Sequence, residues 1–432
     1  IWPGDYVYFI LHKENIDTME AAVRIAERLG PSMLGYAGTK DRRAKTSQWM
    51  SVRRVEPRRL SAAAARLPQL RLGNFCFKDQ GLRLGMLSGN MFRIALRNVT
   101  GPDEKIDLAC QQLKERGFLN YYGLQRFGSR ADTPTYSIGL KLLQGNYKEV
   151  YIDLVGWSVS RLISPYEIGG VENVNYVQLA RNTRLLYVHA YQSWVWNRAA
   201  SERIKRFGTT PAVGDLVPLQ QLAEEDDARN GGQQDGADTQ NGDPTKSTEK
   251  TDKKKEVRHI PVKVLTQEDV DSGSYTIFDI ILPLPGYSVE YPPNMREYYE
   301  QLLTGDGLTM NLKRKVKCYS MAGAFRRVAC RPGAVAWRRA RYSDPFADLL
   351  PSDADLLDHK PVTAIHPDGK YKALLLTMSL PSSCYATMAL RELLRADTSS
   401  NFQAQQNDYH KAGKRPQESE PEGGAKKAKQ EE

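Results

Sequence analysis

Strand-like and helix-like segments alternate at short intervals through the first part of the chain, and this alternation constrains the fold more than any other feature. Residues 6–13 (YVYFILHK) are aromatic and β-branched, which is typical of a buried strand. An apolar stripe with helical spacing follows at residues 19–29, where Asp17 can cap the helix and Gly30-Pro31 ends it. The sequence therefore predicts a fold that mixes helices and strands.

The same alternation continues beyond the first helix. Residues 33–37 and 46–52 are predicted strands joined by a loop at 38–45, so this loop lies where a sheet meets solvent. Apolar residues alternate with arginines at 92–97, as in a half-exposed strand, and a helical stripe spans 106–117. The first part of the chain is thus expected to form sheet with flanking helices.

The composition of the chain changes after about residue 148, where a second domain is expected to begin. The clearest helix of this part is predicted at 184–207. Residues 223–256 contain no aromatic residue and no aliphatic residue larger than alanine, so nothing compensates for the entropy of ordering them. We expect a disordered insertion there and a disordered tail at 398–432.

Positive charge is concentrated in clusters. The formal net charge is +10, and basic residues gather at 42–59, 313–317 and 326–341. Aromatic residues are interleaved with them, at Trp49, Tyr319, Phe325, Trp337 and Tyr342. Basic clusters with aromatic residues are typical of nucleic-acid binding, whereas the alternative is a set of solvated basic faces.

Other features of the composition exclude several classes of protein. No run of eighteen apolar residues occurs, so no membrane span is expected. The five cysteines are scattered and form no C-x-x-C pair, which favours a reducing compartment and no structural zinc. The chain begins with Ile1, from which we expect a fragment of a longer protein. Two basic clusters, Lys414-Arg415 and residues 426–429, resemble a two-part nuclear import signal, so we expect the nucleus, with the cytoplasm as a second compartment.

The stretch GYAGTKDRRAKTSQW, at residues 35–49, places one carboxylate among several cations. Asp41 is followed by Arg42 and Arg43 and preceded by Lys40, and such neighbours favour the ionised form of a carboxylate. A plain turn between strands is the structural alternative, but a turn does not require cations around one carboxylate. A site that handles a phosphodiester chain does, because phosphate contacts position the substrate. A GTPase is excluded, since neither Gly-Lys pair of the chain is followed by Ser or Thr.

A second stretch, NYYGLQRFG at residues 120–128, combines aromatic, amide and arginine side chains between glycines. Residues of these kinds hold flipped-out RNA bases, because aromatic faces stack the base and amides read its edge. Alternatively, Tyr121 and Phe127 are ordinary core aromatics, and we expect this of at least one of them. Asn120 and Tyr122, on the face opposite Tyr121, are the better candidates for substrate contact.

Two further features have structural interpretations. The segment LPLPGY at 282–287 is predicted to be a loop because of its prolines. The six histidines are dispersed, so neither a Ser-His-Asp triad nor a metal site can be proposed from them, and His189 is expected to be a satisfied core or interface residue.

Several segments together resemble the TruD family of pseudouridine synthases. They are GTKDRRAKTSQ at 38–48, NYYGLQRFG at 120–128, LLYVHAYQSWVWN at 185–197, LPLPGY at 282–287 and LTMSLPSSCYATMALRELL at 376–394. They keep the family's order over roughly residues 1–400. The form YYG, the segment SMAGAFR at 320–326 and the long insertion resemble the eukaryotic branch of the family, the pseudouridylate synthase seven homologues.

This resemblance implies an α+β fold. The catalytic domain of the family is a mixed, largely antiparallel sheet with flanking helices, interrupted by an inserted TRUD domain. The implied boundaries are 1–148 for the first part of the catalytic domain, 149–350 for the insertion and 351–397 for the remaining part of the catalytic domain. Family members also carry an upstream segment with a lysine that pairs with the catalytic aspartate, and this chain starts after it.

The resemblance also implies the site. Asp41 is then the catalytic aspartate, and Asn120 and Tyr122 line the uridine pocket. The other implied substrate-binding residues are Thr39, Lys40, Arg42, Gln125, Arg126 and Phe127. The expected substrates are tRNA, at uridine thirteen, and mRNA, and the family suggests a monomer.

Pseudouridine formation moves the ribose from N1 to C5 of uracil, so no metal or redox cofactor is expected. The reaction requires an ionised carboxylate beside the sugar, as nucleophile at C1′ or base at C2′, and a pocket that retains the detached base. Asp41 and Tyr122 are the residues expected to meet these needs. One alternative is a non-catalytic RNA-binding protein on the same fold. An aspartyl phosphotransferase is a poor alternative, because metal ligands of the D-x-D type are missing beside Asp41.

Overall fold

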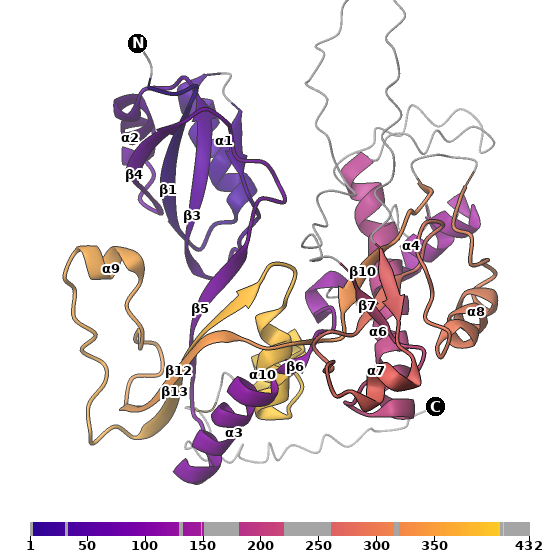
Figure 1. Ribbon diagram of the computed structural model, residues 1–432. Helices are drawn as coiled ribbons and strands as arrows, with labels where there is room; N and C mark the ends of the chain where they lie inside the picture. Colours follow the sequence, from indigo (N-terminus) through magenta and orange to yellow (C-terminus); the bar gives the residue numbers. More distant parts are fainter. Residues whose placement is uncertain are drawn as a thin grey trace, which may run out of the picture.

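The computed structural model describes residues 3–30, 33–128, 133–147, 149–150, 181–219, 261–314, 319–406 and 409. Figure 1 shows an N-terminal sheet with helices α1 and α2 on one side of the molecule and a helix-rich part on the opposite side. A three-stranded sheet lies between these two parts. The predicted disordered insertion at 223–256 lies outside the described residues. No helix in the described ranges combines the length and apolar character needed to cross a membrane.

The N-terminal sheet is antiparallel, with strand order β2-β3-β1-β4. Its inner face carries alternate residues of β1, including Phe9 and Leu11, which are fully buried against helices α1 and α2. Helix α1 begins where predicted, because the Asp17 carboxylate accepts the N–H of Glu20 at 2.8 Å. The elements are β1 (Tyr6–Glu14), α1 (Thr18–Leu29), β2 (Leu34–Tyr36), β3 (Lys45–Arg53), α2 (Pro57–Ala65) and β4 (Leu70–Lys78).

The middle sheet joins distant parts of the chain. Its strands are β5 (Gly89–Leu96), β12 (Gly333–Tyr342) and β13 (Tyr371–Pro381), in the antiparallel order β12-β13-β5. Helices α3 (Asp103–Arg116) and α10 (Ala386–Leu394) pack beside it. Residues 333–342, which the sequence analysis placed inside the expected insertion, pair with β13, and β13 pairs in turn with β5.

A long segment connects β12 to β13. It spans residues 343–370, contains helix α9 (Asp353–Leu357) and is rich in aspartates, and we call it the acidic strap. Leu349 and Leu375 belong to one buried apolar cluster, so the strap is anchored to this sheet by hydrophobic contact.

The helix-rich part has its own core. The fully buried side chains of Tyr191, Trp196 and Tyr299 lie in it, and the long helix predicted at 184–207 is present as α6. The antiparallel sheet of this part has the strand order β10-β9-β7-β8. Strand β11 follows β10 along the chain and pairs with β6 in a separate two-stranded sheet. The elements are β6 (Phe118–Leu119), α4 (Thr135–Gln144), α6 (Arg181–Phe207), β7 (Leu216–Pro218), β8 (Val262–Val264), α7 (Gln267–Asp271), β9 (Ile281–Leu284), α8 (Arg296–Gly305), β10 (Ala324–Arg327) and β11 (Ala329–Cys330).

Two sequence-based predictions need correction. Residues 282–284 are not loop but part of strand β9, where Pro283 lies opposite Phe325 of β10; β7 pairs with β9 only at Ile281, so Pro283 has a paired strand on one side only. The predicted disorder from residue 398 is also wrong for Ser400–Gln406, which form helix α11. There the Ser399 hydroxyl oxygen accepts the N–H of Phe402 at 3.3 Å, as a helix-capping serine does.

Candidate functional site

The loop that carries Asp41 joins β2 to β3, as the sequence predicts, and its backbone is held from the inside by a buried cation. The Lys13 side chain is fully buried, and its ammonium donates to the carbonyls of Ile16 (2.7 Å), Lys40 (3.2 Å) and Asp41 (2.9 Å). Burial lowers the pKa of Lys13, while Asp17 and Asp41 oppose that shift. The sequence analysis missed Lys13, although it continues the alternate, inward-facing positions of β1 and is the one charged residue among them.

Two more buried polar side chains support the same loop. The Thr18 hydroxyl accepts the N–H of Lys40 at 2.8 Å and donates to Gln48 Oε1 at 2.8 Å. Gln48 Nε2 in turn donates to the carbonyl of Gly38 at 3.0 Å. The loop backbone is thus fixed at three neighbouring positions, while the Asp41 side chain remains exposed to solvent.

The cations that flank Asp41 in sequence have different partners in the fold. Arg42 Nη1 lies 3.5 Å from Glu20 Oε2, and Lys45 Nζ lies 2.8 Å from Asp348 Oδ2. Burial lowers the pKa of Lys40, and the Asp41 carboxylate partly opposes that shift. The Asp41 charge thus favours the protonated form of both Lys13 and Lys40.

Asp41 lines a large cavity of about 1180 Å³. The walls are the Asp41 loop, strand β5, residues 348–353 of the acidic strap, and the outer face of the N-terminal sheet, which is the face opposite α1 and α2. The lining cations are Lys40, Arg43, Lys45, Lys78, Arg93 and Arg97. Such a cavity suits a polyanion with an exposed carboxylate at its wall.

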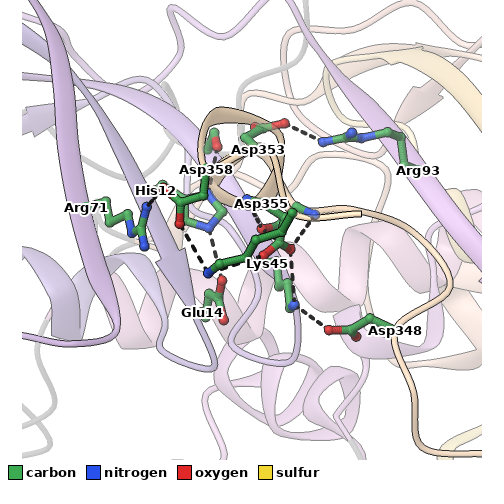
Figure 2. Close-up of polar contacts among 12 residues, drawn as sticks. His12, Glu14, Lys45, Arg71, Arg93, Asp348, Asp353, Asp355 and Asp358 are labelled. Atoms are coloured by element: carbon green, nitrogen blue, oxygen red, sulfur yellow. Dashed lines mark hydrogen bonds and ion pairs between the residues drawn. The ribbon is translucent and has the colours of Figure 1, made fainter. Parts of the chain in front are cut away.

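The acidic strap already occupies some of these cations (Figure 2). Asp348 pairs with Lys45, and Asp353 pairs with Arg93 across to β5. Further along, the Asp358 carboxylate lies 2.8 Å from Arg71 Nη1, and this hydrogen bond, followed by that of Lys360, lowers the pKa of Asp358 to about 2. The strap thus connects β3, β4 and β5 through side-chain charges.

The second predicted segment, Asn120–Gly128, follows β6 and is arranged differently. Asn120 is 5% exposed, and its Oδ1 accepts from Arg326 Nη2 at 2.8 Å while its Nδ2 donates to the carbonyl of Arg327 at 3.2 Å. Arg326 is also buried, and its Nε donates to the Asn120 carbonyl at 2.8 Å. The side chain of Asn120 is therefore engaged inside the protein.

Tyr122 is likewise buried, with 4% of its surface exposed. The Arg326 guanidinium lies 4.0 Å from its ring centroid, and the rings of Trp196 and Tyr385 lie 5.8 and 6.1 Å away. Tyr121, which with Phe127 was a candidate core aromatic, packs against the core but is more exposed than Tyr122, the residue expected to contact substrate. The reason is that β6 ends at Leu119, so the strand alternation on which the expectation rested does not extend to these residues.

The remaining predicted residues of this segment lie nearer the surface. Gln125 Oε1 accepts from the Thr387 hydroxyl at 3.4 Å, Arg126 Nε donates to Ser193 Oγ at 3.3 Å, and the Phe127 ring contacts Tyr136 edge to face. Of the predicted residues near Asp41, Thr39 and Arg42 are exposed and Lys40 is half-buried.

Tyr122 lines a second cavity, of about 710 Å³, together with Tyr121, Phe127 and Trp194. None of its lining residues lines the Asp41 cavity. Asp41 and Tyr122 thus line two different cavities of the described part of the chain, whereas the sequence analysis expected them to share one pocket. Within the described ranges, no three His, Cys, Asp or Glu residues are grouped so that they could hold a metal ion.

Comparisons with known proteins agree on one family. The model of the family "tRNA pseudouridine synthase D (TruD)" matches residues 1–162 and 172–393. The chain is 36% identical to the pseudouridylate synthase 7 homolog of Mus musculus, covering 94% of this chain and 62% of that protein. It is 34% identical to the multisubstrate pseudouridine synthase 7 of Schizosaccharomyces pombe, covering 93% of this chain and 63% of that protein.

A solved structure has the same fold. It is a Methanosarcina mazei protein named for tRNA pseudouridine synthase D (TruD), with a TM-score of 0.56 and 21% identity, covering 92% of this chain and 89% of that one. The described chain therefore has the α+β fold of that structure. It spans just over three fifths of the length of the curated relatives above.

Proposed function

The chain belongs to the TruD family, and from this premise we propose that it is an RNA pseudouridine synthase with Asp41 as its catalytic residue. The observation that carries the proposal is the exposed Asp41 carboxylate on a loop whose backbone is pinned by Lys13, Thr18 and Gln48. A carboxylate held in this way at the wall of a cation-lined cavity is preorganised for work on a ribose within an RNA chain.

In the proposed reaction, Asp41 acts as nucleophile at C1′ or as base at C2′ of the target uridine. The bond between C1′ and N1 breaks, and its electron pair leaves with the uracil. The base then turns, and C5 forms the new bond to C1′ as the Asp41 carboxylate leaves that carbon or, in the second route, as the proton taken from C2′ returns to C2′. C5 then loses its proton and N1 gains one. The product is an isomer of the substrate, so no group is added or lost.

We propose that Thr39, Lys40 and Arg42 hold the RNA backbone beside Asp41, since they border the same loop. Phe127 is proposed to contact RNA from the second cavity, which it lines, and Gln125 and Arg126 are proposed to contact RNA from the same segment of the chain. Asn120 and Tyr122 are implied by the family as residues of the uridine pocket, but both are buried, and Tyr122 lines the second cavity instead of the Asp41 cavity. They would reach the uracil only if RNA binding brought the second cavity to Asp41.

The proposed substrates are tRNA, at the uridine-thirteen type of site, and mRNA. The basic clusters near the C-terminus support import into the nucleus, and the protein is proposed to act as a monomer. These assignments rest on the family and on sequence motifs.

The test uses the protein at its full natural length with a uridine-containing tRNA. Pseudouridine is detected by chemical labelling, and RNA affinity is measured in parallel by fluorescence anisotropy. Asp41→Asn should abolish turnover and change the dissociation constant by less than about threefold, because one charge contributes little beside the whole basic surface. Equal losses of binding and turnover would count against the catalytic role.

The separation of Asp41 and Tyr122 favours one alternative, a non-catalytic RNA-binding protein on this fold. The same assay distinguishes the two. Tight RNA binding by the wild type with no pseudouridine formed, even at enzyme in excess over RNA, would support the alternative and reject the synthase.

A further inference from the structure

Two aromatic side chains lie next to each other on the outer face of the N-terminal sheet. Tyr8 on β1 and Trp49 on β3 have ring centroids 6.4 Å apart, with their planes tilted by 56°. Residues adjacent to Tyr8 on β1 face the core, where Phe9 is fully buried. The outer face is the side without covering helices, so Trp49 keeps 44% of its surface exposed.

Both rings line the cavity that contains Asp41. Strand β3 begins at Lys45, directly after the Asp41 loop, and Trp49 lies four residues further along this strand. An exposed tryptophan inside a cavity leaves a large apolar face in contact with water, which is unfavourable unless a ligand covers it.

The charges around these rings indicate what that ligand is. Lys78 Nζ lies 5.6 Å from the centroid of the Tyr8 ring. Six lysines and arginines line the cavity against three aspartates, which are Asp41, Asp348 and Asp353. An aromatic platform bordered by cations is complementary to a single-stranded nucleic acid, whose bases stack while its phosphates pair with the cations.

We propose that Tyr8 and Trp49 form a stacking subsite for an unpaired nucleobase that flanks the target uridine, with Lys78 holding the neighbouring phosphate. This inference rests on the proposed RNA substrate, but not on the reaction. Tyr8 and Trp49 would then provide aromatic contacts inside the Asp41 cavity, which Tyr122 does not line.

The test measures binding of a fluorescein-labelled tRNA stem-loop to the full-length protein in the Asp41→Asn background, so that no turnover interferes. Trp49→Ala should weaken binding about tenfold, since a stacked base contributes that much or more to affinity. Trp49→Phe should stay within about threefold of its parent. The salt dependence of binding should be unchanged in both variants, because stacking releases no counterions.

The matched control is Phe346→Ala. Phe346 is an aromatic residue with 79% exposure on the acidic strap, outside the residues that line the cavity, and its removal should leave affinity unchanged. Thermal melting of each variant checks that it is folded. Lys78→Ala should, in contrast, lower the slope of log affinity against log salt by about one.

RNAs with a single abasic sugar locate the stacked base. At one position beside the target, the abasic substitution should weaken binding to the parent protein but have little further effect on Trp49→Ala. If folded Trp49→Ala binds within twofold of its parent, if Trp49→Phe is as weak as Trp49→Ala, or if no position shows this coupling, the subsite is rejected. Failure of the parent protein to bind RNA at all would instead reject the proposed function.

Discussion

The Asp41 loop and the Asn120–Gly128 segment were both predicted to contact substrate, but they are built in opposite ways. In the loop, Lys13 donates only to backbone carbonyls, so the backbone is fixed and the Asp41 side chain faces the cavity. In the segment, Arg326 binds the Asn120 amide and covers the Tyr122 ring, so these side chains are engaged by the protein.

The difference concerns what each buried cation stabilises. A cation that satisfies backbone carbonyls leaves neighbouring side chains available for a substrate, whereas one that satisfies side chains makes them part of the core. A cation bound to backbone carbonyls is therefore expected beside a reacting side chain, whereas a cation bound to side chains is expected where two segments pack together in the core. Substitutions of the two cations, Lys13 and Arg326, therefore test this comparison most directly.

The largest effect is expected from Arg326→Met. The substitution leaves two buried oxygens of Asn120 without their donor, and each unsatisfied buried acceptor typically costs about 1–3 kcal/mol. Urea unfolding should report this loss. Arg339→Met is the control, because its ion pairs with Asp103 and Asp107 are exposed and should contribute little to stability. A loss below 1 kcal/mol for Arg326→Met would contradict the structural role of this segment.

Lys13→Met is expected to have the next largest effect. Three backbone carbonyls lose their donor, which should cost about 2–3 kcal/mol, and amides of residues 38–44 should exchange faster with solvent. Turnover should fall by more than tenfold, because the carboxylate is no longer held in place. Lys114→Met, an exposed lysine on α3, serves as the control for charge. Unchanged exchange at the loop would mean that Lys13 does not position it.

Neutralising two aspartates of the acidic strap should have a smaller effect, and this effect should be a gain in RNA affinity instead of a loss of stability or turnover. In Asp348→Asn/Asp353→Asn, Arg93 loses its carboxylate partner, and Lys45 keeps only Asp355, at 3.8 Å, so both cations become more available to RNA phosphates. We expect affinity to rise about threefold at low salt, since exposed ion pairs are individually weak. Asp107→Asn, which removes a similar ion pair on the β12 sheet, should not change affinity. Weaker binding by the double variant would indicate that the strap supports the cavity instead of competing for it.

The smallest expected effect is a change in stability at low pH, which arises from the protonation of Asp358. The pKa of Asp358 is lowered from 3.8 to about 2 by Arg71 and then Lys360, so the unfolded chain binds this proton more tightly than the folded chain does. Its contribution to stability is therefore complete above about pH 4 and is lost as the pH falls through about 2. Carboxyl carbon shifts measured by NMR should show a midpoint near 2, rising toward 3.8 in Arg71→Ala. A wild-type midpoint near 3.8 would show that the ion pair is absent in solution.

Much of the local structure could be predicted from the sequence. The helix after Asp17, the strands on both sides of the Asp41 loop and the long helix α6 all follow from spacing and capping residues. Lys13 could also have been found, because a charged residue at an inward-facing strand position needs buried partners.

The rest depends on contacts between distant residues. The partner of Asn120 is Arg326, 206 positions later, and that of Lys45 is Asp348, 303 positions later. Local patterns contain no information on such pairs, so the burial of Tyr122 and the position of the strap could not be predicted. The family motifs identified the fold, but not how its parts enclose each cavity.

The acidic strap is attached differently at its two ends. Leu349 fixes it to the middle sheet through apolar contacts, whereas its hold on the N-terminal sheet consists of exposed ion pairs with Lys45 and Arg71. Raising ionic strength toward 1 M shortens the electrostatic range to about 3 Å, so it should release the second attachment and spare the first. The width of the Asp41 cavity is then expected to depend on the salt concentration, because screening of these ion pairs lets the strap move away from the N-terminal sheet.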